Sequence, residues 1–112
     1  MRPEYARLMT HLLTIYKRER NWEGNFVVSE SFTGIPGFVE YGKHLVTGLN
    51  GEEVMATAII FLRDDAPITP EHPHWIIEQV LPYVRENMEV VRIDPISDPR
   101  NGRTHHFEVA VK

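Results

Sequence analysis

Two runs of strand-forming residues around a short turn constrain the fold of this chain most strongly. The runs cover residues 38–47 and 52–62, and Gly48-Leu49-Asn50-Gly51 lies between them. Glycine and asparagine tolerate the positive φ angles of tight hairpin turns, so the segment predicts an antiparallel β-hairpin. The hairpin carries several charged residues and no obvious catalytic group, which raises the question of its purpose.

The rest of the chain contains further short β-leaning runs that are separated by turn-forming residues. Three glycines and one proline interrupt residues 19–37, which predicts a long connection with only a short extended piece at 26–28. Residues 63–74 contain three prolines and are expected to form a loop. Asn101-Gly102 is a second hairpin signal. Strands are expected over residues 11–18, 75–80, 88–93 and 104–111.

The segment after the proline-rich loop allows two interpretations. Thr69 and Pro70 can begin a helix with apolar residues along one side, so one short helix around 76–87 is an alternative. Pro82 would lie inside that helix at a cost of about 3 kcal/mol. We therefore favour a strand from 75 to 80, followed by a turn.

These patterns predict a mainly all-β fold, a small antiparallel β-barrel or sandwich with long loops and a protruding hairpin. The chain has 112 residues and no cysteine. Two domains of half that length would each be too small to bury a useful core without disulfides or a metal. Residues 1–112 are therefore expected to form a single domain.

The charge balance argues against tight binding of nucleic acid. The formal net charge is −4, and the 12 lysines and arginines are scattered along the chain. Proteins that grip phosphates usually carry a clustered basic surface, which this sequence lacks. The aromatic residues allow an alternative, a single-strand binder that stacks bases on Tyr41 or Trp75. Packing in the core or at subunit contacts is the simpler explanation of these rings.

The sequence also bears on the compartment. No run approaches the roughly 18 apolar residues of a membrane span, and the first residues lack the apolar centre of a signal peptide. We expect a soluble protein that makes no contact with a membrane and stays where it is made.

Histidines are the only residues that suggest a metal site. Zn²⁺ needs three or four converging ligands, and His72, His74 and one of His105 or His106 are the candidates. Adjacent residues of a strand point to opposite faces, so His105 and His106 are not expected to share a site. Histidines packed at strand edges or subunit contacts are the simpler interpretation, and we predict no metal and no cofactor.

Catalytic groups are equally sparse. Glu52-Glu53 and Asp64-Asp65 are paired carboxylates, but both pairs lie beside turns, where solvated carboxylates are expected. No nucleophile motif and no glycine-rich phosphate-binding motif is present. We therefore predict that the chain is not an enzyme. A metal-dependent enzyme built on the histidines is the alternative from a different class.

Four segments, taken in order, resemble a known family. They are HLLTIYKR at 11–18, VEYGKHLVTGLNGEEVMATAIIFL at 39–62, PIT at 67–69 and RIDPISDPRNGRTHHFEVAV at 92–111. Their order and spacing are similar to those of the head-closure, or stopper, proteins of long-tailed double-stranded DNA bacteriophages. The chain departs from the family at Asn101, where an acidic residue is usual, and at the bulkier VLPYVRENM, where a compact turn is usual.

The resemblance implies a structural role in the virion. Such proteins form a homo-oligomeric ring beneath the portal and adaptor, close the DNA-filled head and later receive the tail terminator and tail tube. The resemblance therefore implies localisation to the neck of the virion after synthesis in the host cytoplasm. It also implies contact with the packaged DNA without sequence-specific binding. An acidic chain suits such a conduit, which must not grip the DNA that slides through it.

The resemblance also suggests which residues carry that role. The hairpin of residues 40–54 would face the channel or pair with a neighbouring subunit, since exposed strand edges invite pairing between subunits. Another tail or neck ring component, such as a tail terminator, is the alternative within the same class. The hairpin candidates are Glu40, Tyr41, Lys43, His44, Thr47, Asn50, Glu52 and Glu53, and the candidate assembly loops contribute Asp64, Asp65, His72, His74, Asn101 and Arg103.

Overall fold

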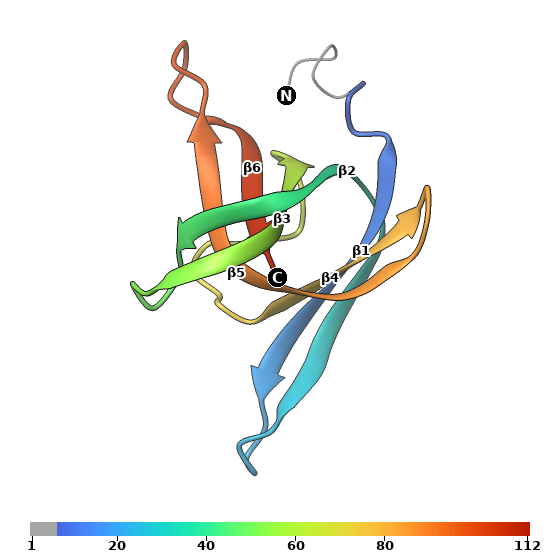
Figure 1. Ribbon diagram of the computed structural model, residues 1–112, viewed down its shortest axis with the longest axis vertical. Helices are drawn as coiled ribbons and strands as arrows, with labels where there is room; N and C mark the ends of the chain where they lie inside the picture. The colour runs from blue at the N-terminus through green and yellow to red at the C-terminus, as the bar shows by residue number, and fades with distance from the viewer. Residues whose placement is uncertain (1–6) are drawn as a thin grey trace.

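A computed structural model describes residues 7–112, which fold into antiparallel strands without any helix (Figure 1). The all-β fold predicted from the sequence is confirmed. Among these residues there is also no helix long and apolar enough to cross a membrane. The strands are β1 (His11–Arg20), β2 (Phe26–Thr47), β3 (Glu53–Arg63), β4 (Trp75–Leu81), β5 (Arg85–Ser97) and β6 (Thr104–Val111).

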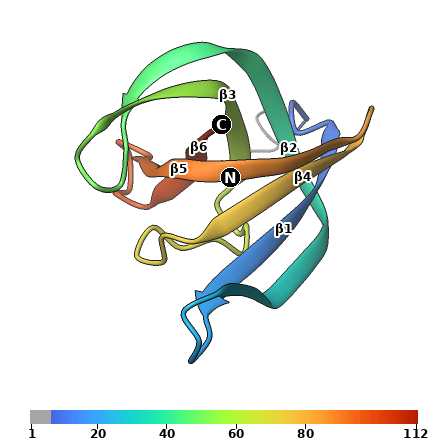
Figure 2. The ribbon, with the colours of Figure 1, turned by 60° about the horizontal axis from the view of Figure 1, so that its bottom comes forward.

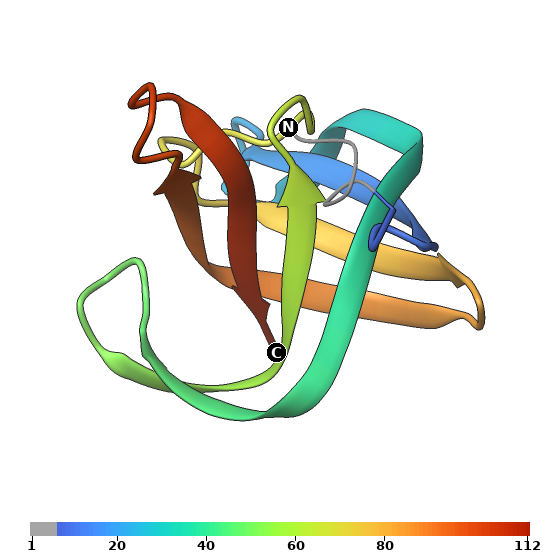
Figure 3. The same cartoon turned by 90° about the horizontal axis from the view of Figure 1, so that it is seen from above.

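The strands close into a barrel with the order β1-β2-β3-β6-β5-β4. Strands next to each other in sequence form hairpins, except β3 and β4, which do not pair. The β3–β6 and β1–β4 pairings complete the ring of strands. Figures 2 and 3 show the curved sheet from two further directions. Closure removes most free sheet edges, and the longest remaining open edge among the described residues is that of β2, each part of which pairs on one side only.

Strand β2 is the longest element and belongs to two hairpins. It has 22 residues; its first part pairs with β1 and its second part pairs with β3. The change occurs at Gly37, which lies opposite both His11 and Leu62. A Cβ atom at Gly37 would come within 2.6 Å of Leu13 Cδ1, so only glycine fits this crowded corner.

The prediction of a long connection over residues 19–37 is therefore wrong. Only residues 21–25 form a turn, and β2 begins at Phe26. The glycines and the proline in this stretch do not end the strand, because they lie where β2 bends or extends beyond the barrel. A bend in a curved sheet favours glycine in the same way as a loop does.

The prediction for the segment after the proline-rich loop is also corrected in part. Strand β4 covers residues predicted as a strand, and the alternative helix around 76–87 is absent. Pro82 lies in the turn between β4 and β5, where its missing N–H costs no ladder hydrogen bond. Strand β5 begins at Arg85 and continues to Ser97, so it is longer than the predicted strand at 88–93.

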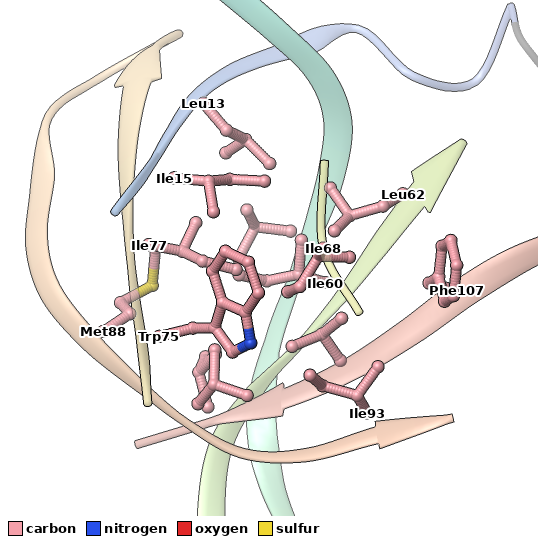
Figure 4. Packing of buried hydrophobic residues seen from close by; sticks show 14 of the residues in the cluster. Leu13, Ile15, Ile60, Leu62, Ile68, Trp75, Ile77, Met88, Ile93 and Phe107 are labelled. Atoms are coloured by element: carbon pink, nitrogen blue, oxygen red, sulfur yellow. The ribbon is translucent and has the colours of Figure 1, made fainter. Parts of the chain in front are cut away.

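Apolar side chains from every strand fill the barrel (Figure 4). Trp75 lies in this core with 2% of its surface exposed, and its indole Nε1 donates a 2.6 Å hydrogen bond to the carbonyl of His72. Alternating residues of β3 and β6 face inward, as a half-buried strand requires. The largest fully buried side chains are Leu13, Ile15, Ile60, Leu62, Ile77, Gln79, Val109 and Val111.

Candidate functional site

Three hairpins leave the barrel and expose large apolar side chains near their ends. Isolated surface apolar residues are ordinary, but clusters of them indicate contact surfaces. The exposed side chains are Trp22, Phe26, Val27 and Val28 in the β1–β2 hairpin, Tyr41, Leu45, Leu49 and Met55 in the β2–β3 hairpin, and Leu81, Tyr83 and Val84 in the β4–β5 hairpin.

The β1–β2 hairpin extends furthest along the molecule, at one end of the longest axis (Figure 1). We call residues 18–28 the arm. The pairing of β1 with β4 ends at Lys17, so β1 and β2 pair only with each other in the arm. Neighbouring Val27 and Val28 point to opposite faces, yet they are 44% and 53% exposed. Both faces of the arm are therefore uncovered.

The tip of the arm is a well-defined turn. The side-chain Oδ1 of Asn21 accepts hydrogen bonds of 3.0 Å from the amides of Glu23 and Asn25. Gly24 adopts a positive φ of 85°, which suits glycine in a tight turn. This turn presents Trp22, the most exposed large apolar side chain among the described residues, with 92% of its surface accessible.

Cationic and aromatic side chains meet at the base of the arm. The guanidinium groups of Arg18 and Arg20 lie 5.1 and 4.7 Å from the centroid of the Phe26 ring. The His74 ring lies 4.5 Å from the same ring, centroid to centroid. Burial lowers the pKa of His74, and the positive charges of His72, Arg18 and Arg20 lower it further. The base is thus a locally cationic surface on an acidic protein.

The β2–β3 hairpin predicted from the sequence is confirmed, but its tip is folded back onto the barrel. The amide of Leu49 donates a 3.1 Å hydrogen bond to the carbonyl of Val91 in β5. Arg92 Nη1 donates a 3.0 Å hydrogen bond to the carbonyl of Thr47. A small second cluster of apolar residues supports this arrangement, formed by Ala56, Val91 and Ala110 with Val46, Val54 and Ile59 packed against them.

All of the predicted hairpin residues except His44 are exposed, and two of the exposed ones also make structural hydrogen bonds. Tyr41 donates its hydroxyl to Oε1 of the buried Gln79 at 2.6 Å, and Thr47 accepts the bond from Arg92 through its carbonyl. His44 is partly buried opposite Ala56. The other exposed members are Glu40, Lys43, Asn50, Glu52 and Glu53.

The predicted assembly loops do not form one surface. Asp64, Asn101 and Arg103 line a polar cavity of about 260 Å³ between two loops. His72 and His74 belong instead to the base of the arm, where His72 Nε2 lies 2.7 Å from the carbonyl oxygen of Arg18. Asp65 forms a 3.2 Å ion pair with Arg63.

The histidines of β6 differ from their predicted geometry. The Nδ1 atoms of His105 and His106 lie 2.9 Å apart, although alternation in a regular strand would separate them. The register shifts here, because Ile96 pairs with His106 and Ser97 pairs with Thr104, which leaves His105 as an extra residue. A bulge of this kind redirects side chains. Among residues 7–112, no group of three or more His, Cys, Asp or Glu side chains is placed to hold a metal ion.

The arm is the feature that the sequence analysis missed. Its signal was present as two runs of extended residues, IYKRER and FVVSES, around an Asn21-to-Asn25 turn that contains Gly24. The polar and charged character of the first run obscured its continuation as a strand.

Comparison with known proteins finds no matching family model, no matching curated protein and no matching solved structure.

Proposed function

We propose that this chain is a non-enzymatic structural subunit of the neck of a long-tailed double-stranded DNA bacteriophage. Copies of it form a ring beneath the portal and adaptor, close the filled head and present the docking surface for the tail. The observation that supports assembly most directly is the arm, which carries exposed apolar side chains on both of its faces. A two-stranded ribbon of this kind is marginally stable in water and gains by packing against a partner.

The open edges of β2 support the same proposal. Residues 26–36 pair only with β1, and residues 38–47 pair only with β3, so each part has one edge without a strand partner in residues 7–112. Unpaired edges of this length promote pairing with other chains. An assembly protein can use such edges for specific contacts between repeated copies of one subunit.

The assignment to the neck rests on the sequence resemblance in residues 39–62 and 92–111. The charge is compatible with it, because a net charge of −4 keeps the protein from holding DNA tightly. In the ring, the exposed carboxylates Glu40, Glu52 and Glu53 would face the channel or a neighbouring subunit. Since the hairpin tip is bonded to β5, this surface is held in position by the barrel.

Genome retention by filled heads tests this proposal. Purified protein is added to portal- and adaptor-bearing, DNA-filled heads, and the DNA that escapes is measured with a fluorescent dye. We expect the wild-type protein to prevent release. A variant without residues 47–52 should fold and bind to the heads, but these heads should release DNA. The double variant Glu52→Gln, Glu53→Gln keeps the hairpin length, so heads that bind it should retain more DNA.

The outcomes separate the proposal from its nearest alternative. Wild-type protein that neither binds heads nor changes DNA release contradicts a head-closure role. Binding to isolated tail tubes in place of heads would favour a tail terminator.

A further inference from the structure

The arm and an apolar groove lie toward opposite ends of the molecule. The groove has a volume of about 270 Å³ and is lined by Leu8, Met9, Phe38, Glu40 and Phe61. The start of β1 and the end of β3 flank it, and Figure 1 shows both of them away from the tip of the β1–β2 hairpin along the longest axis. One subunit therefore carries a projecting aromatic residue at one end and an apolar recess toward the other.

We infer that Trp22 of one copy binds in the apolar groove of a second copy. A tryptophan that is 92% exposed and held by a defined turn is the kind of residue that dominates the energy of interfaces. The groove supplies phenyl rings from Phe38 and Phe61, which can contact an indole by stacking or by edge-to-face packing. Leu8 is 60% exposed beside them and would be covered by the same contact.

The charges near the two surfaces are complementary. Arg20 lies two residues before Trp22 and Glu40 is an exposed lining residue of the groove. Neither side chain has an ion-pair partner among residues 7–112. Docking of the tip brings the Arg20 guanidinium, which is bonded to the Gly24 carbonyl within the arm, toward the Glu40 carboxylate. Such an arrangement favours correct orientation more than it adds affinity.

This contact is heterologous, because different surfaces of the two copies meet. Repetition of a heterologous contact produces a closed ring or an open filament. The inference deepens the proposed function and rests on it for the conclusion that the ring is the form that assembles. A second copy is favoured over an unrelated partner because Trp22, the groove and the two opposite charges of Arg20 and Glu40 are all present in one chain.

Disulfide trapping tests the contact, and the absence of native cysteine makes it specific. Protein with Glu23→Cys is mixed with protein carrying Glu40→Cys, and the mixture is oxidised gently at high protein concentration. We expect a cross-linked heterodimer between the two variants. Adding Trp22→Ala to the first variant should weaken the association by about thirty-fold or more and remove most of the product.

A matched control uses Glu53→Cys in place of Glu40→Cys. This position is also exposed but does not line the groove. Cross-linking at Glu53 equal to that at Glu40, no cross-link at either site, or a product that survives Trp22→Ala would each overturn the inference.

A second measurement distinguishes this inference from the proposed function. Protein with both Glu23→Cys and Glu40→Cys is bound to filled heads and oxidised, and the bound fraction is analysed for cross-linked oligomers. A ladder of cross-linked oligomers supports both the tip-in-groove contact and the head-closure function. Bound protein without a ladder overturns the tip-in-groove contact and leaves the head-closure function intact. Protein that cross-links in solution but does not bind to the heads contradicts head closure alone.

Discussion

The hydroxyl of Tyr41 donates a 2.6 Å hydrogen bond to Oε1 of Gln79, a residue with no exposed surface. Burial is the main reason that the pKa of Tyr41 is raised to about 12, so the phenol remains a hydrogen-bond donor at neutral pH. The Nε2 atom of Gln79 has no hydrogen-bond partner among the described residues. Among residues 7–112, Tyr41 thus supplies the only side-chain hydrogen bond of this buried carboxamide, and the bond connects β2 to β4.

Tyr41→Phe should therefore destabilise the barrel by about 1–3 kcal/mol, because Gln79 would be left buried without any partner. Urea unfolding followed by circular dichroism measures the change. Tyr16→Phe is the matched control: it also removes a tyrosine hydroxyl, but the partner Glu78 is partly exposed and can bond to water. A loss for Tyr41→Phe no greater than that for Tyr16→Phe would contradict the importance of the Gln79 bond.

The pH dependence of the arm base follows from His74. Its pKa lies below the ordinary value of 6.5, chiefly through burial and then through His72, Arg18 and Arg20. The folded state therefore binds its proton less readily than the unfolded state does. Neutral His74 therefore contributes to the free energy of unfolding above pH 6.5. This contribution is lost as the pH falls through the folded-state pKa of His74.

Nuclear magnetic resonance titration of the imidazole signals measures this shift. Arg18→Gln should move the pKa of His74 upward, since it removes a nearby positive charge. The pKa of His11 is lowered by burial alone and should stay unchanged, which provides an internal control. A His74 pKa at or above 6.5 in the wild-type protein would refute the cationic environment described for the arm base.

Gly37→Ala should destabilise the protein by about 1–3 kcal/mol, as overpacking of a close-packed core does. The added methyl group would meet Leu13 Cδ1 at 2.6 Å and the carbonyl oxygen of Phe61 at 3.0 Å. Thermal and urea unfolding measure the change. Ser31→Ala in an exposed part of β2 should alter stability by less than about 0.5 kcal/mol. Equal effects at the two sites would show that the barrel corner tolerates a side chain.

Arg92→Ala should loosen the tip of the β2–β3 hairpin. The substitution removes the bond from Arg92 to the Thr47 carbonyl and the 2.8 Å ion pair with Asp94. Hydrogen exchange of the Leu49 amide, which is bonded to Val91, should become roughly three- to ten-fold faster, as expected for the loss of about one hydrogen bond. Arg63→Ala, which removes the pair with Asp65, should leave this exchange rate unchanged.

The sequence predicted the parts of the fold that depend on local pattern. The turn at Gly48-Leu49-Asn50-Gly51 and the alternation in β6 have local signals, and both elements formed where expected. Gly37 was interpreted as part of a loop, because the sequence does not show whether a glycine ends a strand or allows it to bend. Only the packing of Leu13 and Leu62 around Gly37 distinguishes these cases.

The candidate surfaces were harder to predict than the fold. The turn between two strand-forming runs predicted the β2–β3 hairpin, but the docking of Leu49 onto Val91 is a long-range contact that leaves no local signal. The bulge that joins His105 and His106 depends in the same way on the register between β5 and β6. Trp22 was visible in the sequence, yet its exposure became apparent only when the arm was seen to extend beyond β4.

Electron microscopy of filled heads incubated with the wild-type protein tests the central claim most directly. We expect a ring of density beneath the portal and adaptor that is absent from heads without added protein and is lost or disordered with Trp22→Ala. Heads whose portal vertex is unchanged by a large excess of wild-type protein would contradict the claim that this chain closes the head.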